Sequence, residues 1–165
     1  MNRTKGLAFG ILAGFIYGFT PILGKLTYLE GSNPISLTFY RSFLSIPFFF
    51  VMLKYNKVPL KVDKTQFKKL AILGLLSSVT TLSLYGSYNY ISVGMSTTIH
   101  YIYPVLVTAA CIIIFNEKIS RDKVVSLILS TIGITLFFEG SINMVGIIMA
   151  LLSGVFFAAY LLFMD

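Results

Sequence analysis

Three ionisable side chains lie within or at the end of long apolar runs: Lys25, Arg41 and His100. A charge inside a bilayer is costly, so an ionisable group in a membrane span is a candidate for function. Arg41 can attract an anionic group such as a substrate carboxylate, or it can extend to the lipid headgroups or pair with Glu30. Lys25 ends its apolar run, where it can anchor in the headgroups or contact a ligand.

His100 lies four residues before Pro104. Because proline has no N–H, Pro104 frees the carbonyl of His100 and can kink the helix there. We expect this carbonyl and the imidazole to face a cavity, where they can form a gate or a binding point. A neutral histidine bonded to another helix is the alternative. Pro21 and Pro47 also lie inside apolar runs, and bent or broken helices often line transport sites.

Further aromatic and hydrogen-bonding side chains can add polar surface to such a cavity, and packing between helices is the alternative for each. The candidates are Tyr17, Thr20, Tyr85, Asn89, Tyr101 and Tyr103.

Known enzyme motifs are missing from the sequence. It has no phosphate-binding loop, no H-E-x-x-H and no G-x-S-x-G, and no Asp or Glu lies deep in its first five apolar runs. The single cysteine, Cys111, lies in an apolar run, which leaves no disulfide framework and no cysteine metal site. We therefore expect no enzyme, no metal and no cofactor.

The elements that hold these residues must lie in lipid. Charged residues make up 12% and hydrophobic residues 56% of the chain, whereas soluble domains carry roughly 25% charged residues. A helix needs about 20 apolar residues to cross a bilayer. The sequence therefore predicts an all-α integral membrane protein, a polytopic bundle of about six transmembrane helices. The expected helices lie at residues 7–24, 35–53, 70–88, 95–115, 124–138 and 143–164. The third and fourth are so close in sequence that a tight hairpin must join them.

Basic residues alternate between the loops. With a cytoplasmic N-terminus, all of the 13 Lys and Arg residues except Lys25 and Arg41 lie on the cytoplasmic side, as the positive-inside rule requires. This pattern explains the net charge of +7 without nucleic acid. The expected partners are the lipid bilayer and a small-molecule metabolite substrate.

Small residues recur every fourth position in the first span, at Gly6, Gly10, Gly14 and Gly18. This spacing lets a neighbouring helix approach closely in lipid. The last span repeats it 140 positions later, at Gly146, Ala150, Gly154 and Ala158. Either the two helices have small faces independently, or the chain contains an internal repeat. In the second case residues 1–140 form a five-helix repeat, and residues 141–165 begin an inverted second one in a partial chain. The rest of the second repeat in the same chain, or a homodimer partner, would then complete the helix bundle.

Several segments together resemble one family. They are Tyr-Ile-Ser-Val-Gly-Met-Ser at 90–96, His-Tyr-Ile-Tyr-Pro at 100–104, Asn-Glu-Lys-Ile-Ser at 116–120, Phe39-x-Arg41, Tyr17-Gly18 followed by Lys25, and Gly-Ile-Thr-Leu at 133–136. In their order along the chain, these segments are similar to the EamA-like group of the drug/metabolite transporter superfamily. The resemblance implies a ten-helix transporter of two inverted five-helix repeats, with a substrate cavity enclosed mainly by spans one to four and their counterparts.

The chain departs from the family pattern at Tyr17, where tryptophan is usual, and at His100 and Tyr103, and these departures bear on substrate choice. The expected function is alternating-access transport, in the export direction, of small organic metabolites such as amino acids across the plasma membrane. A non-transporting scaffold or a half-size self-associating subunit is the alternative. Polar residues gathered on one inward face would favour transport, and scattered ones would favour the scaffold.

Overall fold

The structure, a computed structural model, describes residues 3–115, 124–125, 128–129, 132 and 143–164. Its helices are α1 (Arg3–Leu29), α2 (Pro34–Tyr55), α3 (Lys64–Ser87), α4 (Val93–His100), α5 (Tyr103–Phe115) and α7 (Met144–Met164). Among the described residues, five segments are long and apolar enough to cross a membrane, and α4 and α5 together supply one of them. This confirms the polytopic all-α bundle. The span expected at residues 124–138 lies mainly outside the described residues.

Polar side chains set where two of the helices begin. Asn33 precedes α2, and its Oδ1 accepts a hydrogen bond from the backbone N–H of Ser36 at 2.9 Å. The first helical residue is a proline, whose missing N–H costs nothing there. Asp63 and Gln66 exchange side-chain and backbone hydrogen bonds in a capping box. This box starts α3 at Lys64, one and a half turns before the apolar run that marked the expected span.

The hairpin between α3 and α4 is as tight as the sequence predicts. Helix α3 ends at Ser87, and α4 begins at Val93 after Ser92, whose Oγ accepts from the N–H of Met95 at 3.2 Å. The N–H of Ile91 donates to the carbonyl of Ser87 at 3.0 Å, which closes the turn.

The proline in the fourth span divides it into two helices. Helix α4 ends at His100 and α5 begins at Tyr103, so the interruption lies where the missing N–H of Pro104 leaves the carbonyl of His100 free. In contrast, α1 and α2 continue as single helices through Pro21 and Pro47.

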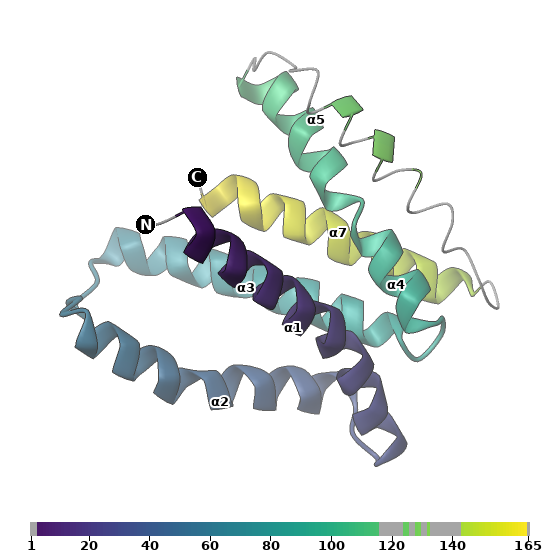
Figure 1. Cartoon of the computed structure of the whole chain (residues 1–165), viewed down its shortest axis with the longest axis horizontal. Coiled ribbons are helices and arrows are strands. Elements are labelled where there is room, and N and C mark those ends of the chain that lie inside the picture. Colours follow the sequence, from purple (N-terminus) through teal and green to yellow (C-terminus); the bar gives the residue numbers. More distant parts are fainter. Residues whose placement is uncertain (1–2, 116–123, 126–127, 130–131, 133–142, 165) are drawn as a thin grey trace.

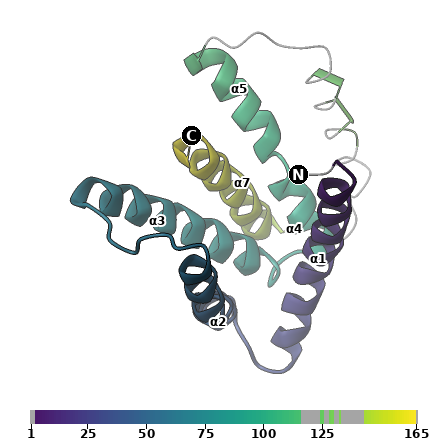
Figure 2. The same ribbon diagram turned by 60° about the vertical axis from the view of Figure 1, so that its left-hand side comes forward.

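Helix α7 packs along α3 and also contacts α4 and α5 (Figures 1 and 2). Its small residues Gly146, Ala150, Gly154 and Ala158 are all buried. A Cβ at position 146 would lie only 2.8 Å from the Cβ of Tyr90. Hydrophobic attraction between helices is weak in lipid, so close backbone approach of this kind holds membrane helices together.

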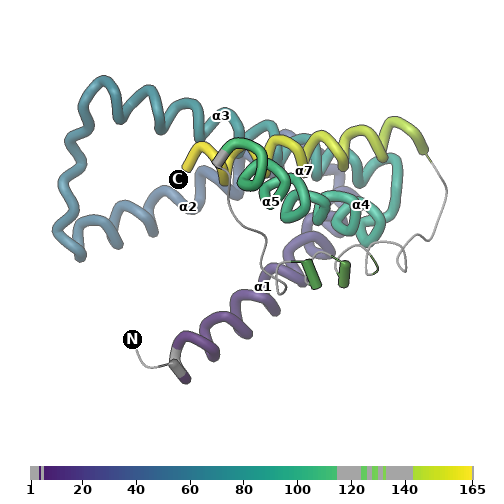
Figure 3. Tube along the Cα trace, turned by 90° about the horizontal axis from the view of Figure 1, so that it is seen from above, coloured from purple at the N-terminus to yellow at the C-terminus, as the bar shows by residue number. Residues whose placement is uncertain are grey.

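The matching glycines of α1 face open space in the described structure. A Cβ at Gly10, Gly14 or Gly18 would meet nothing within 4 Å, and Gly6 is half-buried. Figure 3 shows the N-terminal part of α1 diverging from the other helices. Helix packing by these four glycines therefore stays a prediction.

Candidate functional site

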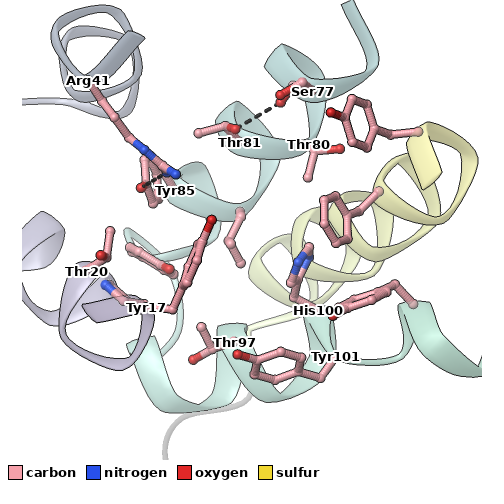
Figure 4. Close-up of a pocket in the computed structure, with 16 residues that line it drawn as sticks. Tyr17, Thr20, Arg41, Ser77, Thr80, Thr81, Tyr85, Thr97, His100 and Tyr101 are labelled. Atoms are coloured by element: carbon pink, nitrogen blue, oxygen red, sulfur yellow. Dashed lines mark hydrogen bonds between the residues drawn. The ribbon is translucent and has the colours of Figure 1, made fainter. Parts of the chain in front are cut away.

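A cavity of about 600 Å³ lies between α1, α2, α3, the α4–α5 junction and α7 (Figure 4). This volume is within the range of sites that hold small organic molecules. Seven of the eight residues predicted to form a substrate site line it: Tyr17, Thr20, Arg41, Tyr85, His100, Tyr101 and Tyr103. The eighth, Asn89, is not among the lining residues: it is exposed on the turn after α3, because that helix ends two residues earlier.

Arg41 reaches from α2 across to α3 (Figure 4). Its guanidinium Nη1 donates to the hydroxyl of Tyr85 at 2.6 Å, and its Cζ lies 5.9 Å from the centre of that ring. These are its hydrogen bond and its ring contact within the described residues, and it forms no ion pair with Glu30 there. The other guanidinium N–H groups remain as donors for a bound anion.

His100 forms the opposite wall, on the last turn of α4. Its Nδ1 lies 2.8 Å from the hydroxyl oxygen of Ser153 on α7, and its ring centre lies 5.4 Å from that of Phe157. The residue is thus both bonded to another helix and part of the cavity lining. Its backbone carbonyl differs from the expectation: the oxygen packs against α7, 2.9 Å from where a Cβ of Gly154 would lie.

Lys25 acts in a way that the sequence did not indicate. Its ammonium donates to the backbone carbonyl of Tyr88, just past the end of α3, and the hydroxyl of Tyr28 donates to the carbonyl of Tyr85 at 3.0 Å. The last carbonyls of a helix lack partners within the helix and carry partial negative charge, so a lysine there is favourable. Lys25 therefore ties α1 to α3 and does not line the cavity.

Tyr88 itself follows the α3 span and lines the cavity. It is 1% exposed, and its hydroxyl has no hydrogen-bond partner among the described residues. A phenol is protonated at neutral pH, so the group remains a hydrogen-bond donor.

Helix α3 carries a polar stripe that was not predicted from the sequence. Ser77, Thr80, Thr81 and Leu84 line the cavity together with Tyr85, at the three- and four-residue spacing of one helical face, which was a readable signal. The hydroxyls of Thr80 and Thr81 donate to carbonyls one turn earlier, at 2.8 and 2.9 Å. Other missed lining residues are Thr97, Phe157 and Tyr160.

The cavity is suited to an anion with an apolar portion. Of its described lining residues, Arg41 is the one with a permanent charge, and none is Asp or Glu. Tyr103 and Phe157 meet edge to face with ring centres 4.7 Å apart, while Phe157 and Tyr160 stack at 5.9 Å. The site therefore offers positive charge on the α2 side and an aromatic surface on the α7 side.

Comparison with known proteins agrees with this architecture. An "uncharacterized transporter" of Helicobacter pylori (strain J99 / ATCC 700824) is 26% identical over 165 residues, covering 97% of this chain and 55% of the relative. The chain thus spans about half the length of that relative. No solved structure matches the chain. The model of the EamA-like transporter family matches residues 4–139, which is most of the chain, and the protein belongs to that family.

Proposed function

We propose that the protein exports small organic metabolites, such as amino acids and related compounds, across the plasma membrane by alternating access. The observation that carries this proposal is the gathering of polar and aromatic side chains from separate helices around one cavity with a single fixed charge. A scaffold has no need to collect buried polar groups at one place, because each of them is costly in lipid.

The second part of the proposal concerns the repeat. Residues 1–140 form one five-helix unit, and residues 141–165 begin an inverted second unit of a ten-helix transporter. The small stripe of α7 supports this, because it is buried against the α3–α4 hairpin and the α4–α5 junction. If α1 is its counterpart, the open glycines of α1 pack in the same way against the second unit. A homodimer partner is the alternative that would cover them.

Within this proposal Arg41 recognises the negative group of the substrate. A cation in a membrane-spanning helix that has no carboxylate partner among the described residues can exchange part of its hydration for an anionic ligand. In the proposed orientation the N-terminus is cytoplasmic, and the loops after α1 and α3 face outward. Arg41 and His100 each lie seven residues from the start of their helices, about two turns inside the outer surface.

Transport by the full-length protein in proteoliposomes tests the proposal. Rates for anionic, zwitterionic and neutral metabolites are normalised to the amount of folded protein. Hydrogen bonds to charged groups contribute about 1.5–3 kcal/mol, so Arg41→Gln should slow charged substrates roughly 10- to 100-fold and neutral ones much less. Lys69→Gln, an exposed change on the first turns of α3, is the control. Wild-type rates for both Arg41→Gln and His100→Gln across all substrates would contradict a binding role for this cavity.

A further inference from the structure

A buried serine on α7 contacts His100, which lines the cavity. Ser153 on α7 is 0% exposed. Its Oγ lies 2.8 Å from Nδ1 of His100 and 2.6 Å from the backbone carbonyl oxygen of Ala150. The hydroxyl therefore links the imidazole to the helix backbone of α7.

Counting protons assigns the direction of these two bonds. A carbonyl oxygen only accepts, so the single hydroxyl proton of Ser153 is donated to Ala150. The contact with His100 is then favourable only if Nδ1 carries a proton and donates it to the serine oxygen. A neutral imidazole has one N–H, which leaves Nε2 as a bare acceptor.

The surroundings of His100 favour this neutral form. Arg41 already places one positive charge in the same cavity, and the described lining residues include no Asp or Glu that would stabilise an imidazolium. Nε2 makes no hydrogen bond within the described part of the chain, and His100 lines the cavity. A ligand in the cavity can reach it.

The same proton count at the opposite wall, formed by Arg41 and Tyr85, shows that this wall donates hydrogen bonds. The hydroxyl of Tyr85 accepts from Arg41 at 2.6 Å, so its own proton remains available. Arg41 and Tyr85 thus supply donors, while His100 supplies an acceptor. One side of the cavity is suited to a carboxylate and the other to an N–H or O–H group.

We propose that Ser153 is a positioning residue that holds His100 in the Nδ1–H tautomer, and that the cavity thereby selects organic anions that also carry a hydrogen-bond donor. The substrate class is amino acids, hydroxy acids and similar compounds, in preference to the same acids without the donor. This selectivity rests on the proposed transport function, whereas the tautomer does not depend on it.

The tautomer is measured directly by nitrogen-15 NMR of the full-length protein, with the His100 signals assigned by their loss in His100→Gln. The expected spectrum of the wild type has a protonated Nδ1 and a bare Nε2, and Ser153→Ala shifts the population toward Nε2–H. A wild-type ring protonated at Nε2 overturns the proposal, whatever the protein transports. Ser96→Ala is the matched control, because Ser96 is also 0% exposed and its hydroxyl has no partner among the described residues.

Binding of two probes to purified full-length protein tests the selectivity. The probes are 3-phenyllactate and 3-phenylpropionate, which differ by one hydroxyl group. We expect the wild type and Ser96→Ala to bind phenyllactate about tenfold more tightly, as one additional hydrogen bond allows. Ser153→Ala should lose this preference and keep its affinity for phenylpropionate.

The outcomes separate the two proposals. Equal affinity of the wild type for both probes, or an unchanged preference in Ser153→Ala, overturns the selectivity while leaving anion binding at Arg41 intact. If the wild type binds neither probe more tightly than Arg41→Gln does, the proposed anion site is contradicted. The proposed selectivity is then contradicted as well.

Discussion

Replacing Gly154 with alanine tests the close approach of α7 to the break between α4 and α5. Gly154 is buried in the middle of α7. A Cβ added there would lie 2.8 Å from Cγ2 of Ile102 and 2.9 Å from the carbonyl oxygen of His100. The isoleucine side chain can move aside. The carbonyl cannot do so easily, because it belongs to the backbone of the break that Pro104 imposes.

Two opposing effects set the size of the change. Alanine is favoured over glycine inside a helix by about 1 kcal/mol. Overpacking of a close-packed contact costs about 1–3 kcal/mol, and the upper part of this range applies where backbone must shift. The expected result is a net loss of about 1–2 kcal/mol in the free energy of unfolding.

Unfolding of the full-length protein by dodecyl sulfate in mixed micelles measures this loss. Gly74→Ala on α3 is the control, since a Cβ there would meet no described atom within 4 Å, and we expect it to be neutral or up to about 1 kcal/mol stabilising. A Gly154→Ala protein as stable as Gly74→Ala would refute the close contact between α7 and the carbonyl of His100.

Two further predictions concern topology and the attachment of α1. In a Cys111→Ala background, an impermeant maleimide applied to intact cells should label a cysteine at Ser32 and not one at Thr65, and the reverse pattern would show an inverted protein. Lys25→Met keeps the apolar stem but removes the donor to the carbonyl of Tyr88. It should lower the free energy of unfolding by about 1–2 kcal/mol, and an unchanged value would mean that this contact does not hold α1.

Much of the fold could be predicted because lipid imposes simple rules on a sequence. Apolar length marked the spans, the few residues between the third and fourth spans required a tight hairpin, and the missing N–H of Pro104 marked the break. Capping lies outside these rules. Helix α3 starts at Lys64 because Asp63 and Gln66 form a polar first turn, which a search for apolar runs does not include.

The site was predictable where it depends on rare side chains and less so where it depends on contacts between helices. Arg41 and His100 stood out because ionisable groups are scarce in membrane spans. Nothing in the spacing of Lys25 showed that it would meet the end of α3. Ser153 was not among the residues that the sequence singled out, and its role depends on the arrangement of α4 and α7, which no local pattern contains.

The most direct test of the central claim, that the cavity is the transport route, is substrate protection of a cysteine at position 97. Within the described residues the Thr97 hydroxyl bonds only to carbonyls of its own helix, so Thr97→Cys breaks no hydrogen bond between the described helices. In a cysteine-free background, including Cys111→Ala, a small thiosulfonate reagent should block transport by the full-length protein, and transported substrate should slow the modification. A cysteine at Ser32, in the outward-facing loop after α1 and outside the cavity lining, should react without loss of transport. Full transport after complete modification at position 97 would contradict the claim.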